Sequence, residues 1–109
     1  MAWLMSDGQV LASAEVAATR AQRRRGLLGR THVEGALVLP RTRWVHTIGM
    51  KVPIDVAHLT ADGTVARTTT MKRHRLGRPV RHSAMVIEAS AGAFERWGVR
   101  PGTHLEVRE

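Results

Sequence analysis

The sequence contains no cysteine, no tyrosine and no asparagine, and its aromatic side chains are one phenylalanine and three tryptophans. Without cysteine there are no disulfides and no thiolate chemistry. No stretch approaches the roughly 18 apolar residues that a membrane helix needs. The first eight residues, M-A-W-L-M-S-D-G, also lack the basic start of a signal peptide. We therefore expect a soluble, cytoplasmic protein with no membrane partner.

Acidic residues and lysines are scarce. The chain has 9 Asp and Glu against 17 Lys and Arg, a formal net charge of +8. Only Lys51 and Lys72 are lysines, an arginine bias that is typical of a GC-rich coding sequence whatever the function. The basic residues fall in two blocks without acids, residues 20–30 and 72–82. The distribution of the positive charge is therefore more informative about function than the net charge.

Both basic blocks could neutralise the phosphates of a nucleic acid. The aromatic side chains that single-strand binders place among such charges all lie outside the two blocks, and no zinc-finger or RNP pattern occurs. Nucleic-acid binding is therefore an alternative that we do not favour. The residues that would carry it are Arg23, Arg24, Lys72, Arg73, Arg75 and Arg78.

At 109 residues the chain should form one domain, residues 1–109, with a single core. Alternating apolar residues and the turns Asp7-Gly8 and Asp62-Gly63 predict antiparallel hairpins. Segments 36–39, 44–48 and 54–59 read as further strands, and 72–82 as a mobile loop. We predict a mainly β (α+β) domain, a small antiparallel β-sandwich or barrel.

Two short helices complete this prediction. Thr19 and Gln22 form a capping box, which predicts a helix over about 20–28 that packs on the sheet with Ala21 and Leu28 on its apolar stripe. A second helix is predicted over about 91–97, where Gly98 ends it.

Asp55 stands out because it lies in a strand with apolar residues on both faces. Burying a carboxylate costs a large desolvation energy unless it is paired or neutralised. It is either a ligand carboxylate or general base, or a structural acid, which would form an ion pair with Arg24, Arg25 or Arg30 or cap a turn. Of these, the structural interpretation is favoured.

His46 precedes Asp55 by nine residues, across a corner that could bring their strands together. A contact between them would give half of a proton-transfer site and a hydrolase-like enzyme. Thr47 and Ser83 are possible nucleophiles, but no pattern marks either one. His58 points to the opposite face from Asp55, and no local His spacing assembles three ligands. We therefore predict no metal and no cofactor.

The chain resembles the bacterial and archaeal family catalogued as domain of unknown function 192. The resemblance rests on the segments Arg25–Arg30, Pro53–Asp55, Asp62–Val65, Ile87–Glu88, Ala91–Gly92, Gly98–Val99 and Pro101–Gly102. It implies a compact, mainly β domain and supplies no reaction. Many members carry Trp-Met-Lys-Asn-Thr before the Pro-x-Asp, where this chain has His46 to Met50. Any site built on that motif is altered here, whereas Arg25, Arg30, Asp55 and Glu88 match.

The leading hypothesis is a non-enzymatic binding or accessory module. Its polar site near Asp55 either recognises a small anionic ligand or fixes the fold. The candidate residues are His46, Thr47, Asp55, Arg25, Arg30 and Glu88.

Overall fold

The computed structural model describes residues 2–109, which form one seven-stranded sheet with two short helices. The predicted mainly β fold with two helices is confirmed. The strand order across the sheet is β5-β4-β6-β3-β2-β1-β7. In chain order the elements are β1 (Ala2–Ser6), β2 (Gln9–Val16), α1 (Arg20–Arg25), β3 (Ala36–Pro40), β4 (Ile54–Leu59), β5 (Val65–Met71), β6 (Met85–Ser90), α2 (Ala93–Trp97) and β7 (Glu106–Arg108).

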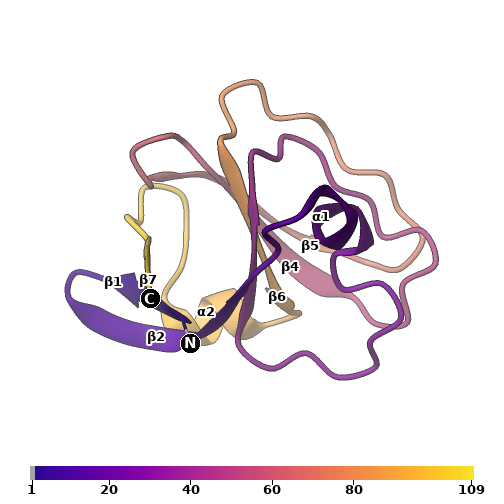
Figure 1. Ribbon diagram of the computed structural model, residues 1–109, viewed down its shortest axis with the longest axis horizontal. Coiled ribbons are helices and arrows are strands. Elements are labelled where there is room, and N and C mark those ends of the chain that lie inside the picture. Colours follow the sequence, from indigo (N-terminus) through magenta and orange to yellow (C-terminus); the bar gives the residue numbers. More distant parts are fainter. Residues whose placement is uncertain (1) are drawn as a thin grey trace.

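The sheet curls into a nearly closed barrel. Its edge strands are β5 and β7, and the segment before β7 bonds back to the start of β5. Val65 N–H donates to the carbonyl of Thr103 at 2.8 Å, and Leu105 N–H donates to that of Gly63 at 2.9 Å. The β1–β7 pair brings the two ends of the chain side by side (Figure 1).

One strand pair departs from the predicted antiparallel pattern. β2 and β3 run parallel, with α1 in the connection between them. Parallel neighbouring strands need such a crossover connection, because a tight turn can join only antiparallel strands. The other strand pairs of the sheet are antiparallel.

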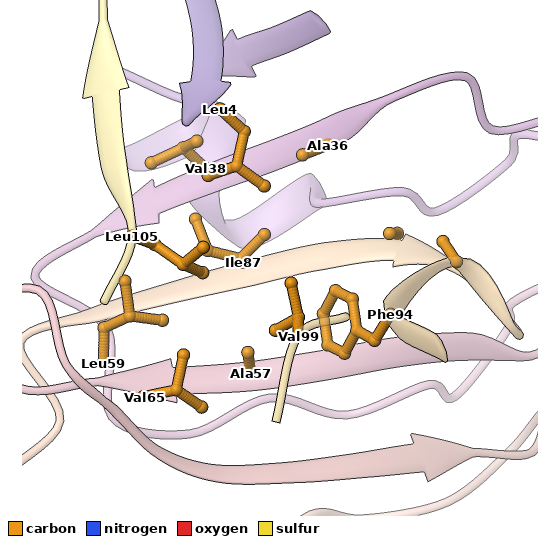
Figure 2. Close-up of a cluster of buried hydrophobic side chains, with 12 residues drawn as sticks. Leu4, Ala36, Val38, Ala57, Leu59, Val65, Ile87, Phe94, Val99 and Leu105 are labelled. Atoms are coloured by element: carbon orange, nitrogen blue, oxygen red, sulfur yellow. The ribbon is translucent and has the colours of Figure 1, made fainter. Parts of the chain in front are cut away.

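Two apolar clusters cover the two faces of the central strands. The interior cluster fills the barrel and includes Leu59, Val65, Ile87 and Phe94 of α2. Figure 2 shows Phe94 and Val99 lying over β4 and β6 inside the barrel. The outer cluster lies on the other face and includes Leu27, Leu39, Val56 and Val86. Every residue of β4 is buried, as expected for a strand that is covered on both faces.

The first helix is shorter than predicted. It ends at Arg25 because Gly26 adopts φ +50°, outside the helical range. The early end rotates the following residues, so Leu27 is buried and Leu28 is 37% exposed. No residue of α1 itself is buried. The prediction that Ala21 and Leu28 form the packed stripe is therefore wrong.

Residues 44–48 do not form the predicted strand. His46 makes a single bridge to Leu76, and the segment pairs with the 72–82 loop instead of with the sheet. Thr47 fastens this contact: its N–H donates to the Arg75 carbonyl, and its hydroxyl oxygen accepts from the Arg75 N–H, each at 2.8 Å. The loop predicted to be mobile is anchored along its length to residues 43–47.

Candidate functional site

A cavity of about 910 Å³ opens on the outer face of the sheet, between α1 with its following loop and residues 41–50. We call it the Glu88 cavity. Apolar side chains and Glu88 lie among its lining residues, and six arginines from two segments surround it. These arginines are Arg20, Arg23, Arg24, Arg25, Arg41 and Arg43.

Glu88 is the buried acid of this cavity. It lies in β6 with Leu37 and Val56 opposite it on the two neighbouring strands, and it is 4% exposed. Among the side chains of residues 2–109, its Oε1 is the one buried nitrogen or oxygen with no hydrogen-bond partner. Burial among apolar groups disfavours the ionised form and raises the pKa of the carboxyl to about 7.

Gly26 lies directly against this carboxyl. A Cβ atom at this position would be 3.1 Å from Glu88 Oε1, and the backbone there has φ +50° and ψ −130°. Glycine is needed both for this conformation and for the close approach. In the turn formed by Arg25, Gly26 and Leu27, the Leu27 side chain is buried. The absence of a side chain at Gly26 leaves space next to Glu88 in the cavity.

The rim carries the exposed aromatic side chain of Trp44. Its indole N–H donates to the Gly77 carbonyl at 2.8 Å, and its ring centre lies 5.5 Å from that of His46. Both rings line the cavity together with Ile48. Trp44 lies outside block 20–30 in the sequence, but the fold places it in the same cavity as the arginines of that block. A planar apolar surface therefore faces a group of cations.

Asp55 lies on the interior face, where three hydrogen bonds hold its carboxylate. Its Oδ2 accepts from the N–H groups of Gly92 and Phe94 at 3.0 and 3.1 Å. Its Oδ1 accepts from the Thr70 hydroxyl at 2.7 Å. Gly92 is the N-cap of α2 and has no side chain, so Asp55 caps this helix from β4. Of the two structural alternatives, the ion pair with an arginine is not formed, whereas the carboxylate does cap backbone N–H groups, at the start of a helix.

The structure does not bring His46 and Asp55 together. His46 lies on the outer side, where its Nδ1 accepts from the Ile48 N–H at 3.2 Å. Asp55 has all its bonds on the interior side. The hydrolase hypothesis required a hydrogen bond between these two side chains, so it loses its geometric basis. Thr47 is fully buried and its hydroxyl is taken up by the loop, which leaves it no role as a nucleophile.

Of the remaining predicted residues, Arg25 lies in the Glu88 cavity and Arg30 lies outside it. Arg30 forms a two-pronged ion pair with Glu15, at 2.8 and 3.2 Å. Hydrogen bonding to Arg30 lowers the pKa of the Glu15 carboxyl. This pair ties the loop after α1 to β2.

The residues proposed for nucleic-acid binding separate into two places. Arg23 and Arg24 line the Glu88 cavity, whereas Lys72, Arg75 and Arg78 line a second cleft beside β5. Arg73 lies exposed on the loop. Arg41 and Arg43 were not among the predicted site residues, although Arg41, Arg43 and Trp44 form a basic and aromatic cluster within four residues of the sequence.

Metal-ligating side chains are dispersed. Within the described residues, 2–109, no three His, Cys, Asp or Glu side chains gather in a group that could hold a metal ion. In the same range no helix has the length and apolar character to cross a membrane.

Fold and cavity together define a small, mainly β domain with a buried acid beneath an arginine-lined opening. The chain belongs to the family DUF192, described as "Uncharacterized ACR", whose model matches residues 2–107. No curated protein matches the chain.

Two solved structures are similar to it. One is a protein of unknown function from Novosphingobium aromaticivorans, with 21% identity and a TM-score of 0.80, covering 96% of this chain and 82% of that one. The other, from Sinorhizobium meliloti, is described as a "putative transcription regulator". It has 26% identity and a TM-score of 0.81, covering 97% of this chain and 91% of that one.

Proposed function

We propose that the protein is a binding module for a small anionic ligand that occupies the Glu88 cavity. The observation that supports this proposal is the unpartnered Oε1 of Glu88 in a cavity surrounded by arginines. A buried polar atom without a partner is costly, and a ligand that donates a hydrogen bond would satisfy it.

The charges around the cavity indicate which chemical group the other end of the ligand carries. The six arginines of the rim present a concentrated positive charge, and a guanidinium binds carboxylate or phosphate with two parallel hydrogen bonds. Aliphatic side chains and Trp44 favour an apolar or planar middle section. The ligand therefore combines an N–H or O–H donor at one end with an anionic group at the other.

A calorimetric comparison of paired anions tests this function. Each pair has the same carboxylate or phosphate, with and without an amine or amide donor, and is measured against wild type at about pH 7. We expect the donor-bearing member to bind about tenfold more tightly, because one buried hydrogen bond contributes roughly this much.

The variants separate the two ends of the site. Glu88→Leu, whose side chain has no hydrogen-bond acceptor, should remove the preference for the donor. Arg41→Ala with Arg43→Ala should weaken both members of each pair. Arg100→Ala is the matched control, because Arg100 is exposed and lies outside both cavities. Equal binding of paired anions by wild type, or no binding of either, would count against the proposal.

Nucleic-acid binding is the second candidate. It is supported by the two basic openings and by the description of the Sinorhizobium meliloti protein as a "putative transcription regulator". Affinity for an oligonucleotide should then fall steeply with salt, because each neutralised phosphate releases counterions. Retention that is unchanged by Lys72→Ala with Arg73→Ala argues against this candidate.

A further inference from the structure

The second cleft, of about 360 Å³, lies between β5 and the 72–82 loop. We call it the His58 cleft. Its charged lining residues are all basic, with Arg67 on β5 and Lys72, Arg75 and Arg78 on the loop. No Asp or Glu lines it among residues 2–109. His58 of β4, only 3% exposed, supplies a polar ring to the same lining.

The hydrogen bonds of Ser83 determine which nitrogen of His58 carries the proton. Ser83 Oγ lies 2.7 Å from the carbonyl oxygen of Thr42 and 2.9 Å from His58 Nδ1. A carbonyl only accepts, so the single hydroxyl proton of Ser83 points to Thr42. The bond to His58 must then run the other way, with Nδ1–H donating to Ser83 Oγ. The neutral ring therefore has a lone pair on Nε2.

This ring stays neutral at physiological pH. Burial, reinforced by the positive charge of Arg67, lowers the pKa of His58 below its usual 6.5. Arg67 faces it from β5, the apolar Val86 faces it from β6, and the cations of the loop complete the surroundings. Within residues 2–109 Nε2 forms no hydrogen bond, and it is not fully enclosed, because Glu88 Oε1 is the one enclosed side-chain atom without a partner. Nε2 is the acceptor that the ring can offer to a molecule in the cleft.

We propose that the His58 cleft is a second anion site, selective for an anion that keeps a hydroxyl group. The chemical class is hydrogen phosphate, free or as a singly protonated phosphate monoester. The basic side chains hold the charge, and the phosphate O–H donates to Nε2 of His58. This site is separate from the Glu88 cavity and does not depend on the function proposed there.

The same geometry selects against the phosphate backbone of a nucleic acid. A phosphodiester carries no proton near neutral pH, so it has nothing to donate to Nε2. A monoester has a second pKa near 6 and keeps its proton on a large fraction of molecules in mildly acidic solution. The His58 cleft should therefore prefer a terminal phosphate to an internal one.

Phosphate and sulfate provide the test, because the two ions have similar size but sulfate has no proton near neutral pH. We expect wild type to bind inorganic phosphate about tenfold more tightly than sulfate at equal ionic strength, as one hydrogen bond predicts. His58→Leu should reduce this ratio to about one while leaving sulfate affinity within about twofold. Lys72→Ala with Arg78→Ala should weaken both ions, and Arg100→Ala should weaken neither.

The tautomer is measured on the wild-type protein by ring ¹⁵N NMR, so the proposal can be tested even if His58→Leu does not fold. We expect Nδ1 protonated, with the Nε2 resonance shifting on addition of phosphate and unmoved by sulfate. As pH falls through the pKa of His58, the ring becomes a donor and the preference for phosphate should shrink. Equal affinity for the two ions, an Nε2–H tautomer, or equal competition by an oligonucleotide without terminal phosphate would each overturn the proposal.

Discussion

Asp55 and Glu88 are two buried carboxyl groups on adjacent strands of one sheet, each 4% exposed, and they face opposite sides. Asp55 accepts three hydrogen bonds, from Gly92, Phe94 and Thr70. Glu88 has an oxygen with no partner and a raised pKa. Burial is the same in both cases, so burial does not distinguish a structural acid from a candidate binding acid. The difference lies in how many donors the fold supplies.

Removing Asp55, whose carboxylate accepts three hydrogen bonds, should cause the largest change in the free energy of unfolding. Asp55→Ala leaves two backbone N–H groups and one hydroxyl without their acceptor, and we expect a loss of about 4 kcal/mol in unfolding free energy. Urea denaturation measures this loss. Thr70→Val is the matched control, because it deletes one of the three bonds and should cost about 1 kcal/mol. A loss below about 1 kcal/mol for Asp55→Ala would mean that the helix cap contributes little.

Replacing Glu88, the acid with an unpartnered oxygen, should increase the free energy of unfolding at high pH, whereas replacing Asp55 should decrease it. Between the unfolded pKa of 4.5 and the folded pKa of about 7, the native state holds a proton that the unfolded chain releases. Stability is therefore lost as pH rises through this window, by about 3 kcal/mol in total. Glu88→Gln should not show this loss, because the glutamine side chain does not ionise.

The expected result is that Glu88→Gln is more stable than wild type at about pH 8, by up to about 3 kcal/mol, with the advantage vanishing near pH 4. Denaturation at several pH values measures it. If Glu88→Gln is instead less stable at about pH 8, Glu88 has a cationic partner in solution, and Arg25 would be the first to test.

A substitution at Gly26 tests whether this residue packs against the Glu88 carboxyl. Gly26→Ala places a methyl group 3.1 Å from Oε1 and forces a side chain into a conformation reserved for glycine, which should cost about 2 kcal/mol. In a Glu88→Ala background the crowding disappears and the backbone strain remains, so the cost should fall by about half. An unchanged cost would show that the two residues do not contact each other.

The smallest effect is expected at the surface. Arg30→Ala breaks the ion pair with Glu15, whose side chains are 39% and 60% exposed, and should cost at most about 0.5 kcal/mol at low salt. Thermal melts in low and high salt measure this cost, which screening should reduce. A cost comparable to that of Asp55→Ala, unchanged by salt, would contradict the weak surface ion pair expected here.

The sequence predicts the local parts of this fold well. The hairpin turns at Asp7-Gly8 and Asp62-Gly63, the capping box at Thr19 and the fully buried β4 all depend on neighbouring residues. The parallel β2–β3 pair and the bridge between His46 and Leu76 depend on partners far along the chain. Local periodicity carries no information on such partners, so segment 44–48 was assigned to a strand that does not form.

The candidate site was predicted in part for the same reason. Arg25, His46 and Glu88 were selected and do line one cavity. Asp55 was selected on burial, which the sequence indicates, whereas its three donors come from α2 and β5 and are visible only in the fold. The lone pair of His58 depends on Ser83 and Thr42, which lie 25 and 16 residues away in the chain.

The pairing of β1 with β7 has a consequence for synthesis of the protein. β1 pairs with β7, which follows it by about 100 residues in the chain. While the chain leaves the ribosome, the β1–β2 hairpin presents an unpaired edge, the kind of surface that joins other chains. Completion of the barrel must wait for β7, so the nascent chain is exposed to aggregation until that strand has been made.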